Sequence, residues 1–447
     1  DDQIGRLVDG LRAMGQLDNT VIVVLADNGA SQEGGPFGVM HEMKFFNGIF
    51  ETPDEAVARI DDIVGPHSHT NYPWGWAQAG NTPFKWYKQN THEGGVHVPM
   101  ILHAPGIVPA DQAGTTRRQF VNVSDIVPTI YDLVGVSAPG VYRGIEQLPV
   151  TGHSFASVFD DPDAPATNTL QYFEMGGSRA LVAHDGDATW KAVCKHDKGA
   201  DYDTEPWELY RLDDDWSECD DLAGRQPEKL AELIELWWQE AERHGVLPLD
   251  DRMFELFGAR FRPNSPHPEN RRYVYRPPMS PLPGQAAAAI GGRSFDLIAR
   301  ITREHGDEGV LFATGTENAG VSVFVQDERL VVDYNAFDDH TVLESSIEVP
   351  AGDSTLVVEV RRRGRRTGSM AIDIDGTPAG SIELPLFMSM MSSVGPSVAY
   401  DHGSAISNRY EAPFAFTGTL HEVVIQLLSR EDVAAREAEA AAEMSRQ

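Results

Sequence analysis

The first part of the chain carries a hydrophobic pattern that predicts one amphipathic helix followed by a buried strand. Apolar residues spaced three and four apart, from Ile4 to Met14, predict the helix. Residues 21–25 (VIVVL) form a continuous apolar run, which is typical of a parallel strand covered on both faces. One helix cannot cover such a strand, so we expect the chain to begin in the middle of a domain.

The apolar pattern predicts a second buried strand and a core helix farther along. Residues 96–103 (VHVPMILH) fit the strand, and the apolar spacing from Ile126 to Val134 fits the helix. Asp125 stands at the start of that helix as a candidate N-cap. We therefore expect a structural role for Asp125 rather than a catalytic one.

The predicted strand at 21–25 ends in Asp27-Asn28-Gly29, which allows two interpretations. In open α/β sheets, ligands bind outside the carboxyl ends of the strands, and two adjacent oxygen donors suit a hard cation such as Ca²⁺ or Mg²⁺. The same three residues are also ordinary turn chemistry that closes a strand. These residues alone leave both interpretations open.

Residues 31–80 are irregular and rich in Gly, Pro, aromatic residues and His, with a short helix expected at 53–63. Long loops in a compact domain usually serve as lids or binding loops. His41, His67 and His69 are possible metal ligands, but no His-x-x-x-His pattern supports that role.

Two lysines precede a glycine turn in the next stretch. Lys85 and Lys88 stand before Glu93-Gly94-Gly95, and loop lysines are normally solvated. The glycines allow the backbone to turn sharply back toward the sheet. Such a turn would direct a preceding lysine into the same crevice as Asp27 and Asn28.

From residue 170 the pattern changes to short strands joined by turns, which predicts a small antiparallel sheet covered by one helix. The expected strands are residues 170–174, 179–183, 190–194 and 207–212, and the helix spans residues 227–244.

From about Ser294 the chain is expected to be all-β. Alternating runs such as 321–325 and 355–360, with turn signals such as Asp375-Gly376 between runs, predict strands without helices. Even strand spacing is typical of a β-sandwich of jelly-roll type. The predicted division of the chain is 1–165, an α/β domain; 166–250, the small antiparallel sheet with its helix; 251–284, a connector; 285–430, the β-sandwich; and 431–447, a tail.

Composition and charge narrow the function classes. The 447-residue chain has a formal net charge of −32, which argues against nucleic-acid binding because a phosphate backbone would be repelled. A local cation can still bind a small anionic substrate. No apolar run approaches the roughly 20 residues of a membrane span, so we expect no membrane partner. Cys194 and Cys219 form no CxxC pair, which disfavours a thiolate zinc site and leaves one disulfide open.

Four stretches, in this order, resemble the carboxyl-terminal part of type I sulfatases, in particular the large bacterial arylsulfatases. They are GRLVDGLRAMGQLDNTVIVVLADNGA, KQNTHEGGVHVPMILHAPG, SDIVPTIYDLVG and WELYRLDDDWSECDDLA. The resemblance covers roughly residues 1–250, and the connector and β-sandwich also resemble the larger members. It implies an alkaline-phosphatase-like α/β sheet, incomplete here because its N-terminal part is missing, with a small antiparallel subdomain and a C-terminal β-sandwich.

The resemblance also implies an activity and a site. Members of the family hydrolyse sulfate monoesters with one Ca²⁺ ion and a formylglycine made from Cys or Ser in a C/S-x-P-x-R motif. Matched residue by residue, Asp27 and Asn28 correspond to metal ligands, and Lys88 corresponds to a sulfate-binding cation five positions before the Glu-Gly-Gly sequence. Lys85 does not hold that position. The implied partner is a small-molecule sulfate ester.

The sequence departs from the family pattern at the nucleophile. No C/S-x-P-x-R motif occurs in the chain, and neither Cys194 nor Cys219 is followed by the required residues. Ca²⁺ takes six to eight oxygen ligands, and Asp27 with Asn28 supplies at most about three. We therefore expect half a metal site, one substrate cation and no nucleophile, and a chain that is inactive by itself.

Two alternatives remain open. A phosphate or phosphonate monoester hydrolase of the same fold would differ in the nucleophile and metal residues that this chain lacks. The second alternative is a module that only binds glycans or partners through its β-sandwich. The net negative charge of the chain disfavours anion binding by the sandwich. The sequence indicates neither the compartment nor the oligomeric state.

Overall fold

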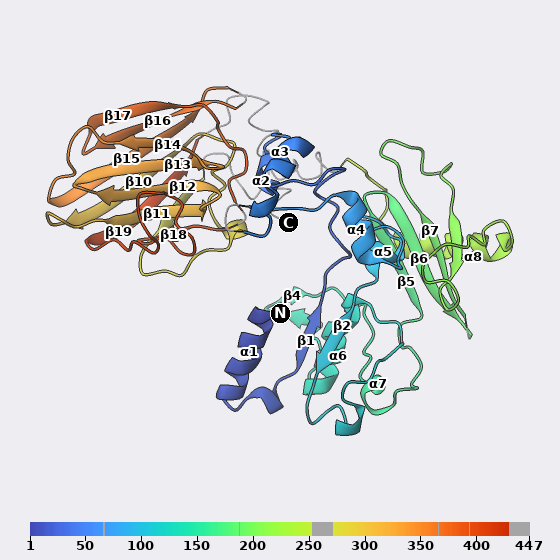
Figure 1. The fold of residues 1–447 in the computed structure, drawn as a ribbon. Coiled ribbons are helices and arrows are strands. Elements are labelled where there is room, and N and C mark those ends of the chain that lie inside the picture. Colours follow the sequence, from blue (N-terminus) through green and yellow to red (C-terminus); the bar gives the residue numbers. More distant parts are fainter. Residues whose placement is uncertain (66–67, 187, 253–270, 365, 393, 429–447) are drawn as a thin grey trace. The chain divides into compact units, whose positions relative to one another are not determined.

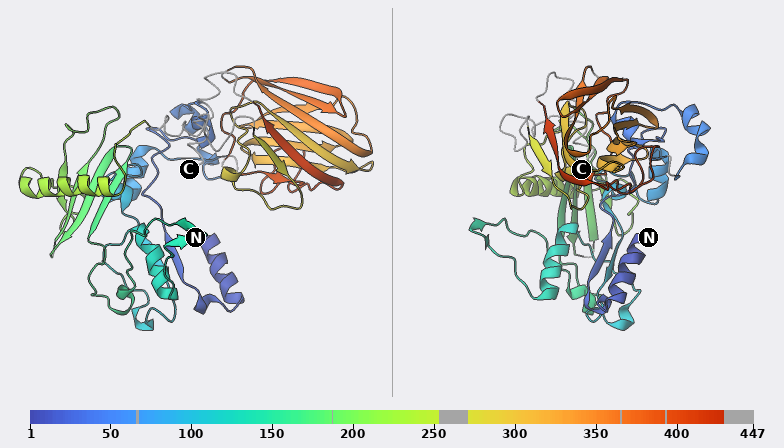
Figure 2. Two further views of the ribbon diagram at one scale, coloured as in Figure 1. Left: turned by 180° about the vertical axis from the view of Figure 1, so that it is seen from behind. Right: turned by 90° about the vertical axis from the view of Figure 1, so that its left-hand side faces the viewer.

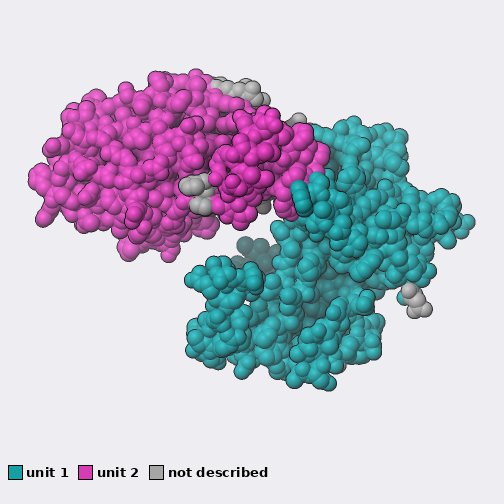
Figure 3. Space-filling model, viewed as in Figure 1, with its two compact units in different colours: residues 1–32, 75–251 teal, residues 33–74, 252–447 magenta. Residues whose placement is uncertain are grey.

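The computed structural model describes residues 1–447 except 66–67, 187, 253–270, 365, 393 and 429–447. The chain forms two compact units (Figure 3): unit 1 consists of residues 1–32 and 75–251, and unit 2 of residues 33–74 and 252–447. The predicted tail, His67 and part of the predicted connector lie outside the described residues. The predicted boundaries at 165, 250 and 284 stay predictions.

Unit 1 begins with the predicted helix and strand, but the strand pairs differently from the prediction (Figure 1). Helix α1 spans Asp2–Ala13, and β1 spans Ile22–Leu25. Strand β1 pairs antiparallel with β2, Met100–His103, and Ile22 faces His103 in the register. The expectation of a parallel strand buried on both faces is therefore wrong for this pair, because an apolar run indicates burial but not strand direction.

The core expected around β1 is thin in the described chain. No residue of α1 is buried, and the residues of β1 are half-buried or exposed. Ile101 in β2 is 67% exposed. Val96, expected to begin a strand, instead ends a short helix, α5, at Glu93–Val96, and residues 97–99 belong to no helix or strand.

The helix predicted after Asp125 is present as α6, Ile126–Val134, but it is less buried than a core helix, because only Thr129 is buried and Ile130 and Val134 are exposed. Asp125 precedes α6, but its side chain does not cap that helix. Its carboxylate instead accepts hydrogen bonds from the main-chain N–H groups of Asn122 (2.8 Å) and His153 (2.8 Å) and from the side chain of Asn168 (3.1 Å). Buried Asp125 thus joins three segments; it stands at the N-cap position of α6, as predicted, but its side chain makes no capping hydrogen bond there.

The remaining short elements of unit 1 complete this region. They are η1 Leu17–Asn19, α4 Trp74–Asn81, η3 Ala110–Gln112, η4 Val123–Asp125, β3 Val141–Tyr142, β4 Ile145–Glu146 and α7 Ser157–Asp160. Helix α4 begins at the boundary with unit 2 and lies in a stretch that the sequence pattern left irregular.

The predicted antiparallel sheet with its helix is confirmed. Its strands follow in the order β5-β6-β7-β8, and α8 packs on β5, β6 and β7 (Figure 2). Leu233 and Trp237 of α8 are fully buried against the sheet. The bounds are β5 Leu170–Met175, β6 Ser178–Asp185, β7 Ala188–Cys194, β8 Glu208–Arg211 and α8 Pro227–Arg243.

Unit 2 is a sandwich of two antiparallel sheets, as the alternating runs predicted; the finer jelly-roll assignment stays a prediction. The six-stranded sheet has the order β17-β16-β15-β10-β19-β9, and the five-stranded sheet has the order β14-β13-β12-β11-β18. Inward residues such as Leu297 of β10 and Val323 of β12 share one core.

The strands of unit 2 range from 2 residues in β18 to 11 in β15, and tight turns join several of them. Asp375 and Gly376 both have positive φ and close the hairpin between β16 and β17, as the turn signal predicted. The bounds are β9 Arg272–Tyr275, β10 Phe295–Arg303, β11 Gly309–Thr316, β12 Ala319–Gln326, β13 Arg329–Ala336, β14 Asp339–Glu344, β15 Gly352–Arg362, β16 Gly368–Ile374, β17 Thr377–Leu384, β18 Ser397–Val398 and β19 Thr419–Leu427, with η6 at Gly284–Ala286.

Residues 33–74, which sequence reasoning kept with the α/β domain, group with the sandwich. The side chain of Asn47 accepts a hydrogen bond from Ser389 N–H (2.6 Å) and donates one to the carbonyl of Met390 (2.7 Å). This segment contains α2 (Glu42–Phe46), α3 (Pro53–Ala58) and η2 (Ile60–Asp62), and the last two account for the helix expected at 53–63. No helix in the described ranges is long and apolar enough to cross a membrane.

Candidate functional site

Asp27 and Asn28 stand where β1 ends, in unit 1. Asp27 is exposed, and its side chain makes no hydrogen bond or ion pair with any other residue that the structure describes. Asn28 is half-buried, and its Nδ2 donates to the carbonyl of Gly29 over 3.0 Å. That bond uses the amide nitrogen and leaves Oδ1 as the oxygen atom that Asn28 presents.

Gly29 fixes this strand end against the Glu-Gly-Gly sequence. Its N–H donates to the carbonyl oxygen of Gly95 over 3.1 Å. A Cβ at position 29 would lie 1.7 Å from the carbonyl oxygen of Gly94, so only glycine fits. The DNG and EGG segments are therefore in direct main-chain contact, 60-odd residues apart in sequence.

Asn81, at the end of α4, holds the two segments together. Its Oδ1 accepts from the N–H of Ala30 (3.0 Å), and its Nδ2 donates to the carbonyls of Gly94 (2.6 Å) and Trp86 (3.0 Å). Sequence reasoning missed this residue, because a single asparagine at the end of a weakly patterned helix carries no distinguishing signal.

The structure brings the backbone of Lys88 to the same place. The N–H of Lys88 donates to the carbonyl of Ala30 over 3.0 Å, and the residue is half-buried. Trp86 and Gln89 on either side of it have positive φ, which bends the loop tightly around Lys88. Asp27, Asn28 and Lys88 thus come from two segments joined by main-chain hydrogen bonds.

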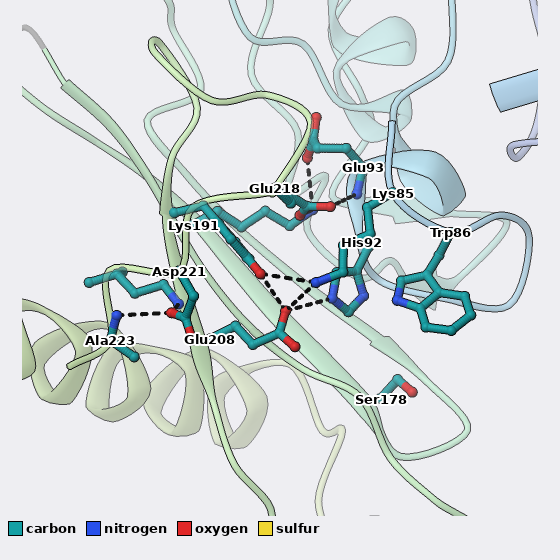
Figure 4. A network of polar contacts seen from close by, with 12 residues as sticks. Lys85, Trp86, His92, Glu93, Ser178, Lys191, Glu208, Glu218, Asp221 and Ala223 are labelled. Atoms are coloured by element: carbon teal, nitrogen blue, oxygen red, sulfur yellow. Dashed lines mark hydrogen bonds and ion pairs between the residues drawn. The ribbon is translucent and has the colours of Figure 1, made fainter. Parts of the chain in front are cut away.

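Lys85 has a different environment. Its Nζ lies 2.9 Å from Glu208 Oε2 and 3.0 Å from the hydroxyl of Tyr210. Glu208 also lies 3.1 Å from the ring of buried His92 (Figure 4). Burial would raise the pKa of Glu208, but the hydrogen bonds from His92, Tyr210 and Lys85 outweigh it and lower that pKa to about 2. Lys85 is thus engaged in an ion pair that joins its loop to β8.

A second polar cluster lies beneath the Glu-Gly-Gly sequence. Lys191 reaches from β7 to Glu93 (2.7 Å) and Glu218 (2.9 Å), and all three side chains are buried (Figure 4). Glu93 also lies 2.6 Å from the ring of His97. Burial would raise the pKa of Glu93, but the charge of Lys191 and the contact with His97 lower it to about 2.

Two of the histidines considered as ligands, His41 and His69, lie among the described residues. His41 and His69 belong to unit 2, where their backbones form a β-bridge. His41 is 1% exposed, and burial together with nearby Lys44 lowers its pKa to about 4. His69 lies 3.4 Å from Glu42. In the described part of the chain, no three His, Cys, Asp or Glu side chains form a cluster that could hold a metal ion.

The side chains at the end of β1 carry the type of ligand atom that a hard cation binds, but they are too few to complete its coordination. Asp27 offers an unpaired carboxylate and Asn28 an amide oxygen, which are the ligand atoms that Ca²⁺ takes. Two side chains cannot supply six to eight oxygens.

The two cysteines are free thiols, Cys194 buried and Cys219 exposed, so the disulfide left open by the sequence does not form.

Comparison with known proteins places this region in a family. The model of the sulfatase family matches residues 1–136. An uncharacterised sulfatase of Schizosaccharomyces pombe is 31% identical over 270 residues, covering 59% of this chain and 45% of that protein. The arylsulfatase of Klebsiella aerogenes is 29% identical over 161 residues, covering 35% of this chain and 32% of that protein.

A sulfatase named for a sugar substrate is similar as well. The N-acetylglucosamine-6-O-sulfatase of Bacteroides thetaiotaomicron is 24% identical over 259 residues, covering 58% of this chain and 36% of that protein. The chain therefore spans less than half the length of each of these relatives. The expected family assignment is supported: residues 1–136, which carry Asp27, Asn28 and Lys88, match the model of the sulfatase family.

Proposed function

We propose that the complete protein hydrolyses sulfate monoesters and that residues 27–88 supply part of its active site. The observation that carries the proposal is the junction of the DNG and EGG segments. Main-chain hydrogen bonds from Gly29 to Gly95 and from Lys88 to Ala30 place a carboxylate, an amide and an ammonium group on adjoining segments. Opposite charges held in this way suit an anionic substrate bound beside a cation.

Asp27 and Asn28 would hold one Ca²⁺ ion together with ligands that this chain does not contain. When bound, the ion supplies positive charge that neutralises sulfate oxygens. The described residues support this role in their chemistry, because Asp27 is an exposed carboxylate and Asn28 presents an amide oxygen. Hard oxygen donors suit either Ca²⁺ or Mg²⁺, and the resemblance to the sulfatases makes Ca²⁺ the expected metal.

Lys88 would bind a sulfate oxygen as a point charge. A lysine ammonium is a compact donor with three N–H groups, which suits a single oxyanion rather than a planar carboxylate. The bent loop on either side of Lys88 and its main-chain bond to Ala30 reduce the freedom of the residue before substrate arrives. Lys85, which is paired with Glu208, has no part in this proposal.

The nucleophile would come from polypeptide outside this chain, because no C/S-x-P-x-R motif occurs in the 447 residues. The surface of unit 1 agrees with a larger catalytic domain. Apolar side chains on α1 and β2 are exposed, among them Leu7 (58%) and Ile101 (67%). We propose that further polypeptide covers this surface in the complete enzyme.

The test is the turnover of an aryl sulfate and of the corresponding aryl phosphate by the complete protein. We expect the sulfate to have the higher kcat/KM. A higher kcat/KM for the phosphate would replace the proposal with a phosphate monoester hydrolase. The relatives are named for aryl and for amino-sugar sulfates, so a panel of both sulfate classes would identify the alcohol part of the substrate.

A further inference from the structure

The side chain of Lys191 is completely buried, and the residues on either side of it in its strand, Trp190 and Ala192, are apolar. Its Nζ contacts Glu93 Oε1 at 2.7 Å and Glu218 Oε1 at 2.9 Å, and those side chains are 7% and 0% exposed. A buried lysine is costly unless it is paired with carboxylates, and here it has two. This pairing joins a strand of the antiparallel sheet to the short helix α5, 98 residues earlier in the sequence.

The two carboxylate oxygens of Glu218 contact both partners of this ion pair, Lys191 and Glu93. One of its oxygens pairs with Lys191, and the other accepts a hydrogen bond from the main-chain N–H of Glu93 over 2.9 Å. Glu218 itself has a positive φ of 56°, a conformation that a non-glycine residue rarely adopts. Both the side chain and the backbone of Glu93 are therefore fixed from β7 and from the loop after β8 (Figure 4).

Glu93 leads directly into the contacts of the proposed site. Gly94 and Gly95 follow it, and their carbonyl oxygens accept hydrogen bonds from Asn81 and from Gly29. A shift of Glu93 would therefore move the carbonyl oxygen that accepts the hydrogen bond from Gly29, the residue next to Asn28. It would also disturb the loop of Lys88, because Gly94 N–H donates to the carbonyl of Lys85 over 2.9 Å.

We propose that Lys191 is a positioning residue: through Glu93 and Glu218 it holds the Glu-Gly-Gly sequence in place, and so keeps Asn28 and Lys88 at their working positions. The inference rests on the proposed function for its effect on turnover. Its structural part concerns only contacts between described residues of unit 1. Nothing in the chemistry of sulfate hydrolysis requires Lys191 to touch the substrate.

The experiment compares Lys191→Met with Lys229→Met in the complete protein. Lys229 is a matched control, because it is 13% exposed and also pairs with two carboxylates, Asp185 (2.9 Å) and Glu232 (3.1 Å), away from Glu93. We expect Lys191→Met to lower kcat/KM by about 10²-fold, the cost of displacing positioned groups by about 1 Å. Lys229→Met should stay within about twofold of wild type.

A second readout does not depend on turnover. Amide hydrogen exchange at Gly29, Lys88 and Gly94 should be at least about tenfold faster in Lys191→Met than in wild type, and unchanged in Lys229→Met. Lys191→Met combined with Glu93→Gln should lose no more activity than the more damaging single variant, since both act through one contact. If Lys191→Met does not fold, Glu218→Gln gives a milder test, with the same direction expected.

Unchanged exchange at these amides in a folded Lys191→Met protein would overturn the inference. So would losses of activity that add fully in the double variant. If the wild-type protein hydrolyses no sulfate ester, the proposed function fails, and the exchange measurement alone still decides whether Lys191 positions the two segments.

Discussion

The N–H of Gly29 donates to the carbonyl oxygen of Gly95 over 3.1 Å, which joins the end of β1 directly to the Glu-Gly-Gly sequence. The contact is so close that a Cβ on residue 29 would lie 1.7 Å from Gly94 O. Each of the two segments carries one part of the proposed site. Their junction therefore sets the separation between the proposed metal ligands and the lysine proposed to bind sulfate.

Gly29→Ala should disrupt this junction. The added methyl group forces the two segments apart, so we expect a loss of about 1–3 kcal/mol in stability and a fall in activity. Gly10→Ala is the control, because no atom lies within 4 Å of a Cβ there. In helix α1 it should stabilise the protein by roughly 0.5–1 kcal/mol. Equal melting temperatures for the two variants would show that the junction is not tight.

Lys88→Met should weaken turnover of sulfate esters much more than Lys85→Met. Removing a charge that faces the reacting oxyanion costs about 10²–10³-fold in rate. Lys85 lies 2.9 Å from Glu208, so its replacement should affect stability and leave KM for the substrate near the wild-type value. Steady-state kinetics of both variants test this prediction. A larger loss of turnover in Lys85→Met than in Lys88→Met would indicate that Lys85, and not Lys88, binds the sulfate group.

Lowering the pH should reduce the folding stability of unit 1, because Glu93 becomes protonated. Its pKa is lowered from 4.5 to about 2 in the folded protein, so Glu93 contributes stability above pH 4.5 that is lost as the pH falls toward 2. The full contribution is about 3 kcal/mol, at 1.36 kcal/mol per pKa unit. Urea unfolding followed by tryptophan fluorescence, which buried Trp237 makes sensitive to unit 1, measures the loss.

Glu93→Gln serves as the internal check on that pH dependence. It should be less stable than wild type at pH 6, and the difference should shrink as the pH falls below 4.5. The exposed Glu228→Gln variant should keep the wild-type dependence. A Glu93→Gln protein with the same pH dependence as wild type would show that Glu93 is not the responsible group.

The 447-residue chain by itself should not hydrolyse aryl sulfates. It contains no C/S-x-P-x-R motif from which the family's nucleophile could be made. An assay of the purified chain at high protein concentration, with the complete protein as the positive control, tests this expectation. Calcium-dependent turnover by the chain alone would show that another residue acts as nucleophile.

The sequence predicted those elements whose periodicity is strong. Helix α8 at Pro227–Arg243 and the hairpin turn at Asp375-Gly376 follow from an apolar helical face and from a two-residue turn signal. The direction of β1 did not follow, because a run of apolar residues does not distinguish parallel from antiparallel pairing. Helix α4 was missed because its aromatic, Gly and Ala residues give no clear amphipathic pattern.

The candidate site was predictable only in part for a similar reason. Asp27, Asn28 and Lys88 were named from a strand end and a family resemblance. Lys191 is separated from Glu93 by nearly a hundred residues, and only tertiary structure reveals that pairing. A signal was present, however: Lys191 interrupts an apolar strand between Trp190 and Ala192, where a charged residue needs a buried partner.

The most direct test of the account is the calcium dependence of aryl sulfate hydrolysis by the complete protein, measured for wild type and for Asp27→Asn, with Asp18→Asn as an exposed control. We predict that removing the metal abolishes turnover, that added Ca²⁺ restores it, and that only Asp27→Asn requires a higher Ca²⁺ concentration. Hydrolysis that persists without metal, or that responds to Ca²⁺ identically in all three proteins, would contradict the proposed site.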